Sequence, residues 1–272
     1  MSKDVVGTVR KAWRIMREKG PGRVQIWFIA LIIGVVAAGA AVLFRLGINL
    51  LQSTLYGTEN PRLLHSFAET LPWYMVLLIP VFGGLLVGLI LSRFTDDHRS
   101  RSVAEVIEGA ALHDGRVEQK EGLASALASM ITLSTGGSTG REGPVVHLAG
   151  VISSWVSNRI HADGITGRDL LGCAVAAAVS ASFNAPIAGA LFALEVILRH
   201  FAVHAFAPIV IASVAGTIVS RLVFGDVTEF TLVQEGALAF YVELPAFLIL
   251  GMLAGVVAAL LMGSIFLADD LG

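Results

Sequence analysis

The chain is poor in cysteine and in charged residues. It has one Cys among 272 residues, which excludes an internal disulfide and a zinc site built from cysteines. Lys, Arg, Asp and Glu make up only 15% of the residues, against about 25% in a typical soluble domain. Hydrophobic residues make up 55%, the mean hydropathy is +0.77, and the net charge of −2 gives no basic footprint for nucleic acid. This composition predicts a multi-pass membrane protein with no nucleic-acid partner, and we assign no metal and no cofactor.

Polar residues divide the chain into apolar stretches of helical length. Residues 26–44 and 74–91 are uncharged runs of 19 and 18 residues, and residues 245–267 form a third long run. A membrane-spanning helix needs about 20 apolar residues. Residues 170–198 and 205–219 are also apolar, but the first run is interrupted by polar residues and the second is short. The pattern predicts an all-α fold that combines spanning helices with short, broken ones.

Basic residues indicate the orientation in the membrane. Residues 1–23 carry seven Lys or Arg with apolar residues at helical spacing, which predicts an amphipathic helix on the cytoplasmic surface. A signal peptide is the alternative, but the following apolar run exceeds the usual core of about 7–15 residues. A second basic cluster lies at residues 93–101. The excess of Lys and Arg on cytoplasmic loops puts both clusters inside and residues 52–70 outside.

The second apolar run contains the pattern Gly84-Leu-Leu-Val-Gly88. Such a GxxxG pattern lets two helices in a membrane approach closely. Small residues spaced by chance explain it equally well, so both interpretations stay open.

Residues 136–150 read GGSTGREGPVVHLAG and interrupt the apolar background. Glycines allow a tight backbone, and Pro144 suits the first turn of a helix. The free N–H groups at a helix N-terminus form an anion site, and transporters use broken helices in this way. Glu142 can occupy that site as a tethered anion, which a free anion or a proton must displace, so Glu142 is a candidate gate. The alternative is a glycine-rich turn with a capping carboxylate.

Two further stretches suggest helix ends inside the membrane. Ser102 and Glu105 have the spacing of a capping box that opens a helix to about residue 111. This helix is either a second anion-facing end or, as the sequence alone favours, an ordinary capped connector. Asn184 as N-cap and Pro186 in the first turn predict that residues 170–198 form two short helices.

Glu195 ends the second of these helices. A carboxylate inside a membrane is a functional candidate by default. The favoured alternative is an acid at a helix end that pairs with Arg199, four residues further on.

The residues Gly140-Arg141-Glu142-Gly143-Pro144 resemble the signature of the CLC family of chloride channels and chloride/proton antiporters. Residues 181–195, ASFNAPIAGALFALE, resemble the motif that follows in that family, and residues 107–110 align Ser102 with its anion-binding serine. The resemblance implies a multi-pass CLC-type membrane domain that transports chloride as its substrate. It implies that Glu142 is the gate and proton carrier. The residues that the resemblance places around the anion are Ser102, Gly140, Arg141, Gly143 and Pro144.

The chain departs from the family pattern at two places, beside the anion-binding serine and at the position of the internal acid. Arg101 and Val103 replace two glycines beside Ser102, and Glu105 replaces a proline. Val196 stands where proton-coupled members have an internal acid, which leaves Glu195 as a weak substitute. The choice between channel and antiporter, with protons as a second transported species, therefore stays open.

The resemblance also implies an organisation for the chain. Residues 1–23 are the cytoplasmic helix, 24–223 the first half of the membrane domain, and 224–272 a connector with the first helix of the second, inverted half. The family's later Gly-Ser-Phe-x-Pro motif and pore tyrosine have no match, so we expect this chain to be part of a longer protein. Residues 170–198 and 205–219 correspond to the family's dimer interface, which implies a homodimer. We expect a bacterial inner membrane, with the N-terminus in the cytoplasm.

Other functions remain to be weighed against transport. A non-transporting or incomplete membrane subunit fits the missing second half, and a related transporter with other broken helices is a further alternative, against which the two ordered motifs argue. Ser138 lies in a G-x-S-x-G pattern, as in serine hydrolases, with His147 as the nearby base. That pattern needs a strand–turn–helix context and an Asp/His pair, so we expect a transport protein and not an enzyme.

Overall fold

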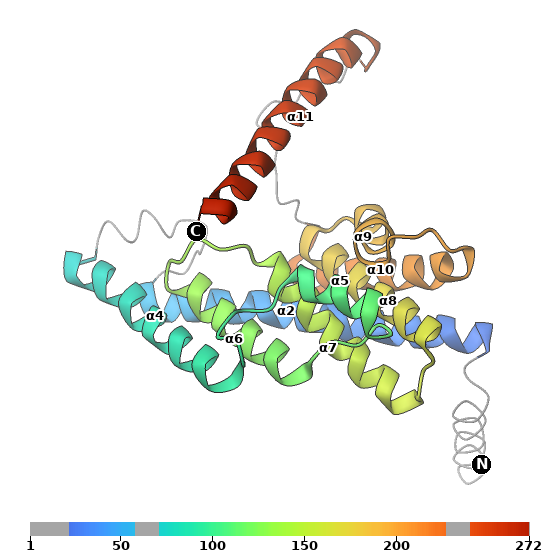
Figure 1. The fold of residues 1–272 in the computed structure, drawn as a ribbon, viewed down its shortest axis with the longest axis horizontal. Coiled ribbons are helices and arrows are strands. Elements are labelled where there is room, and N and C mark those ends of the chain that lie inside the picture. The colour runs from blue at the N-terminus through green and yellow to red at the C-terminus, as the bar shows by residue number, and fades with distance from the viewer. Residues whose placement is uncertain (1–21, 58–70, 227–239, 272) are drawn as a thin grey trace. The chain divides into compact units, whose positions relative to one another are not determined.

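The structure is a computed structural model that describes residues 22–57, 71–226 and 240–271. Every regular element in these ranges is a helix, as the sequence predicts (Figure 1). The chain divides into two compact units, residues 1–229 and residues 230–272, and the described part of the second is the helix α11, Phe240–Leu271. The amphipathic helix expected before residue 22 and most of the connector after residue 226 fall outside the described residues.

Four of the described helices are long and apolar enough to cross a membrane. They are α2, Arg23–Tyr56; α4, Trp73–Phe94; α10, Val203–Phe224; and α11. Three correspond to the predicted spans, whereas α10 is longer than the short helix expected at residues 205–219. Pro208 lies inside α10, as its sixth residue, and the helix continues past it.

Helix α2 runs well past the end of the apolar stretch predicted at residue 44. It includes Arg45 and ends at Gly57, which adopts the left-handed conformation with φ of 69°. The guanidinium of Arg45 stacks 4.5 Å from the centre of the Phe224 ring, so the helix accommodates the charge. Arg45 comes 22 residues after Arg23, about 33 Å along the helix, which exceeds the hydrocarbon thickness of about 30 Å. The predicted span stops before Arg45, the first charged residue after the apolar run. The helix continues past Arg45 and is longer than the hydrocarbon layer is thick.

Helix α8, Gly164–Phe183, is the centre of the first unit. Helices α2, α7, α9 and α10 pack around it, and residues 170–181 are almost completely buried (Figure 1). Small residues permit this packing. A Cβ on Gly216 of α10 would lie 2.4 Å from the backbone oxygen of Ala177, and a Cβ on Gly34 of α2 would lie 2.8 Å from the Cα of Ala212. The core is therefore built from helix backbones in close contact.

The break after α8 differs from the prediction in one detail. Asn184 is the C-cap of α8, with φ of 54°, and not the N-cap of the next helix. Asn tolerates the left-handed conformation at a helix end, and its amide group donates to Asp226 and accepts from Arg221. Helix α9, Pro186–Phe192, starts with the predicted proline in its first turn and continues into a π-helical turn, η2, Ala193–Leu198.

Three buried serines hold this break in place. Ser180 and Ser213 share a hydrogen bond of 2.6 Å, and Ser213 also donates to the backbone oxygen of Pro186. Ser220 donates to the backbone oxygen of Ala181 at 2.7 Å. A broken helix leaves backbone groups without helical partners, and these hydroxyls satisfy some of them inside an apolar core.

The GxxxG pattern in α4 does not mark a helix contact among the described residues. A Cβ on Gly84 or Gly88 would meet nothing within 4 Å. The neighbouring Gly83 makes the close approach instead, because a Cβ there would lie 2.3 Å from Oγ1 of Thr135. Helix α4 thus packs on α6, Gln119–Ser134, through a glycine outside the pattern.

Candidate anion site at the junction of two helix ends

Helix α7, Glu142–Ile160, begins within the glycine-rich stretch at residues 136–150. Gly136 has φ of 92°, a conformation that favours glycine, and the N–H of Gly137 donates to the backbone oxygen of Thr132 at 2.8 Å. The chain thereby reverses after α6 and enters α7. Arg141 is the N-cap and Glu142 lies in the first turn, the geometry that the sequence predicts.

Helix α5, Val103–Leu112, supplies the second helix end. Its N-cap is Ser102, and the predicted capping box forms. The backbone N–H of Ser102 donates to Oε2 of Glu105 at 2.7 Å, and the Ser102 hydroxyl lies 3.4 Å from the same oxygen. The N-terminal end of α5 is therefore occupied by a carboxylate from its own first turn.

The N-termini of α5 and α7 meet. A Cβ on Gly143, the second residue of α7, would lie 3.5 Å from the Cβ of Ser102. Each helix N-terminus carries roughly half a positive charge and a set of free N–H groups. Two such ends side by side favour an anion more than either end alone. Glycine at position 143 leaves room at this contact, because even a Cβ there would already be in van der Waals contact with Ser102.

The predicted gate lies at this junction. Glu142 is half-buried, and Nε of Arg141 donates to its Oε1 at 3.2 Å. The other oxygen, Oε2, lies 3.6 Å from the position of a Cβ on Gly140. Pro144 is buried in the first turn of α7. The structure thus gathers the five signature residues at one helix start, with Ser102 against the second of the glycines.

Glu195 lies on η2 and is exposed. Arg199 ends η2 in the left-handed conformation, with φ of 57°. No ion pair joins Glu195 to Arg199, although both residues are described. The favoured interpretation of Glu195 as the partner of Arg199 is therefore wrong, and the reason is that Arg199 leaves the helical path on which an i, i+4 pair depends.

Sequence reasoning missed a partly buried ion-pair cluster next to Ser102. Nε of Arg101 donates to Oε2 of Glu121 at 2.6 Å, its NH1 lies 3.0 Å from Oδ2 of Asp97, and the same NH1 lies 3.9 Å from Oε1 of Glu105. Glu121 is 6% exposed. Burial lowers the pKa of Arg101, but the hydrogen bond to Glu121 and the three nearby carboxylates outweigh it, so that pKa lies above its ordinary value. Charges spaced by up to 24 residues carry no local signal, so only the fold reveals the cluster.

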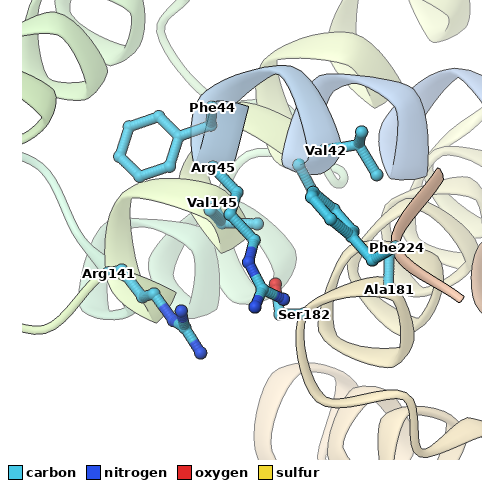
Figure 2. Close-up of a pocket in the computed structure, with 9 residues that line it drawn as sticks. Val42, Phe44, Arg45, Arg141, Val145, Ala181, Ser182 and Phe224 are labelled. Atoms are coloured by element: carbon cyan, nitrogen blue, oxygen red, sulfur yellow. The ribbon is translucent and has the colours of Figure 1, made fainter. Parts of the chain in front are cut away.

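Arg45 is a second residue that the sequence analysis did not single out. It lines a pocket of about 10 Å³, room for about one water molecule, together with Arg141, Ser182 and Phe224. Figure 2 shows the guanidinium groups of Arg45 and Arg141 extending toward the same side of this pocket. The start of α7 therefore has a second arginine from α2 beside it. The sequence feature that could have identified Arg45 is its position as the first charged residue after the apolar run 26–44.

Two other chemistries receive little geometric support. Ser138 is exposed in the loop before α7, while His147 is buried with an Nδ1 that has no hydrogen-bond partner, so the described residues form no serine–base pair. His200 and His204 have a spacing that also suits metal ligands. Nε2 of His204 lies 3.5 Å from Oδ2 of Asp169, but the described ranges contain no group of three His, Cys, Asp or Glu that could hold a metal.

These helices and this junction define an integral membrane protein with broken helices around an anion-suited site, and comparison with known proteins gives the family. The model of the family "Voltage gated chloride channel" matches residues 83–271. The chain belongs to this family, that of the CLC chloride channels and antiporters, as the sequence motifs indicate.

Individual relatives agree in sequence and in fold. A chloride channel protein described as ClcB-like, from Ralstonia nicotianae, is 32% identical over 87% of this chain and 56% of its own length. A slow cyanobacterial Cl−/H+ antiporter has the same fold, with a TM-score of 0.69 at 22% identity over 87% of this chain and 55% of that one. A CLC-type fluoride/proton antiporter matches with a TM-score of 0.65 at 23% identity, over 85% of this chain and 55% of that one. The chain spans little more than half the length of each of these proteins.

Proposed function

We propose that this chain takes part in chloride transport across a membrane, as a CLC-type channel or chloride/proton antiporter subunit with Glu142 as the gate. The observation that carries the proposal is the contact between the N-termini of α5 and α7 at Ser102 and Gly143. Membership of the family supports it. We assign no enzymatic activity, no metal and no cofactor; chloride is the substrate.

The proposed mechanism follows from the charges at the junction. Two helix N-termini attract an anion, and the carboxylate of Glu142 competes for that position because it is itself an anion. Protonation of Glu142 removes the competing charge and opens the site to chloride. The anion contacts that we propose are the N–H groups near Ser102, Gly140 and Gly143, with Arg141 and Pro144 shaping the start of α7.

The first experiment measures transport by the full-length protein from its natural reading frame, reconstituted in liposomes. Chloride efflux and proton movement are recorded together. Chloride movement coupled to opposing protons supports an antiporter, and chloride movement alone supports a channel. If correctly folded protein moves no chloride at any pH between 4.5 and 7.5, the proposed transport function is wrong.

The gate is tested with Glu142→Gln. The amide mimics a protonated carboxyl group, so we expect chloride flux to persist while its dependence on external pH and any proton coupling are lost. Glu195→Gln is the matched comparison, because this acid is exposed on η2 and lies outside the signature residues at the start of α7. If Glu195→Gln abolishes proton coupling while chloride flux remains, Glu195 supplies the internal proton step. A dependence of chloride flux on external pH that is unchanged in Glu142→Gln contradicts the gate assignment.

We also propose that the protein is a homodimer in a bacterial inner membrane. Large apolar side chains on α9 and α10 are exposed, among them Ile187, Val203 and Leu222. Such surface suits a partner subunit or lipid. Residues 170–181 of α8, which the sequence analysis placed in the same interface, are buried within the chain, and the exposed apolar side chain at that end of α8 is Phe183. Light scattering in detergent measures the subunit number, and a monomer at all concentrations would contradict the dimer.

A further inference from the structure

Glu105 holds a position that parallels that of Glu142. Each is an acid in the first turn of a helix, and the two helices meet at their N-termini. The Glu105 carboxylate already accepts the backbone N–H of Ser102 at 2.7 Å, and the Ser102 hydroxyl lies 3.4 Å from it. A chloride bound at this helix end would need those same donors, so Glu105 and the anion compete.

A polar cleft connects Glu105 to solvent. The cleft has a volume of about 780 Å³ and is lined by Glu105, Glu108, Arg101, Glu121 and His147, among others. The Glu105 side chain is 30% exposed. Water in the cleft can therefore deliver a proton to Glu105 without passing the Glu142 side of the junction.

His147 provides an independent indication that the cleft holds a ligand or ordered water. It is 1% exposed, yet its Nδ1 has no hydrogen-bond partner among the described residues. It lies one helical turn beyond Gly143, the glycine that contacts Ser102, and its ring packs against Gly122 of α6. A buried imidazole nitrogen without a partner is costly unless water or an ion satisfies it.

We propose that Glu105 is a second, internal gate: ionised, it occupies the N-terminal end of α5 at Ser102, and chloride binds there once Glu105 takes up a proton from the cleft and leaves. This inference rests on the anion transport proposed above. The proton adds to a carboxylate oxygen, breaks the hydrogen bond to Ser102, and returns to cleft water when Glu105 ionises again. Glu105 thereby also supplies an internal proton-binding group in a chain that has Val196 at the family's usual position for one.

Several charges around Glu105 set the conditions for this exchange. Arg101, on the segment before α5, lies 3.9 Å from its Oε1. Glu121 of α6 pairs with the same Arg101. His147 of α7 lines the same cleft, and η2, which also packs on α5, carries the exposed Glu195. Glu108, on α5 itself, is the remaining acid of this helix at the cleft.

A purely structural capping box is the competing explanation, and Glu105→Gln separates the two. Glutamine at this position also closes a capping box, so the helix end is retained while the titratable charge is removed. The variant is made in full-length protein that already carries Glu142→Gln, so that the only remaining competing carboxylate is the proposed one. Glu108→Gln in the same background is the control, since it removes an acid from the same helix and cleft.

Chloride binding is measured by titration calorimetry at pH 5 and pH 7.5. In the Glu142→Gln protein we expect binding to weaken at the higher pH, whereas Glu105→Gln should make it equal at both. Glutamine replaces the charge-assisted hydrogen bond to Ser102 by a weaker neutral one, so chloride should bind roughly tenfold more tightly at pH 7.5. Glu108→Gln should retain the pH dependence. If Glu105→Gln retains it as well, Glu105 is only a helix cap and the inference is wrong.

A second measurement needs no variant. A water-soluble carbodiimide labels accessible carboxyl groups, and peptide mass spectrometry compares Glu105 with Glu108 in the wild-type protein. Chloride that displaces Glu105 should raise its labelling severalfold relative to Glu108. Labelling of Glu105 that ignores chloride at every pH contradicts the inference. Absence of chloride binding and flux in every protein would instead overturn the proposed function, and this inference with it.

Discussion

The contribution of Asp163 to the stability of the protein can be measured by removing its charge. Asp163 is the N-cap of α8, and its Oδ1 accepts the backbone N–H of Thr166 at 3.0 Å. Hydrogen bonding from Thr166 lowers the pKa of Asp163. Replacement of a capping Asp by Ala typically destabilises a protein by about 1 kcal/mol. We therefore expect Asp163→Ala to lower the thermal unfolding temperature in detergent at neutral pH.

The pH dependence of this effect has a definite sign. Because the pKa is lower in the folded protein than the value of about 3.9 in an unfolded chain, the ionised cap stabilises α8 above that value. Its contribution is lost as the pH falls through the folded pKa. The difference in unfolding temperature between wild type and Asp163→Ala should therefore shrink below about pH 4. Asp163→Asn keeps a capping oxygen without the charge, so its difference from Ala should not change with pH; a wild-type cap that is equally insensitive would contradict this account.

Helix packing in this protein depends on which glycine faces a neighbour. A Cβ on Gly83 would lie 2.3 Å from Oγ1 and 2.6 Å from Cβ of Thr135, while a Cβ on Gly84 would meet nothing within 4 Å. Overpacking a helix contact costs about 1–3 kcal/mol, whereas Ala in an exposed helix position is favoured over Gly by up to about 1 kcal/mol. We expect Gly83→Ala to lower the unfolding temperature and its neighbour Gly84→Ala to leave it unchanged or raise it. Equal effects of the two variants would mean that α4 does not pack on α6 at this point.

The same elements show what a sequence can and cannot predict. Apolar runs, Pro144 and the capping box predicted the existence and type of α2, α4, α5 and α7, because these signals are local. The end of α2 and the role of Asn184 were mispredicted, because tertiary partners decide them: Phe224 stacks on Arg45, and Asp226 and Arg221 hold Asn184.

Of the candidate site, the start of α7 was predictable from its glycines and Pro144. Its contact with Ser102 came from family resemblance alone, since nothing in the residues themselves brings positions 40 apart together. The pairing of Arg101 with Glu121 had no sequence signal at all.

At the scale of the whole molecule, the topology of the chain in the membrane decides which end of each proposed site is internal and which is external. The Lys and Arg clusters before α2 and after α4 predict that the start of α2 and the end of α4 both face the cytoplasm. Thr54 lies 31 residues after Arg23 on the same helix, about 46 Å away and beyond a hydrocarbon layer of about 30 Å. Thr54 and Ser100, both exposed, should therefore face opposite sides of the membrane.

Cysteine labelling tests this sidedness with little interference. The chain has one cysteine, Cys173, which is completely buried and should not react. A membrane-impermeant maleimide added outside intact cells should label Thr54→Cys but not Ser100→Cys, and added to inside-out vesicles it should do the reverse. The unmodified protein is the control for background at Cys173. Labelling of both positions from one side would show that α2 and α4 do not form an out-and-back pair. Labelling of Ser100→Cys from outside would place the cleft at Glu105 on the side of the membrane opposite to the one that an internal gate requires.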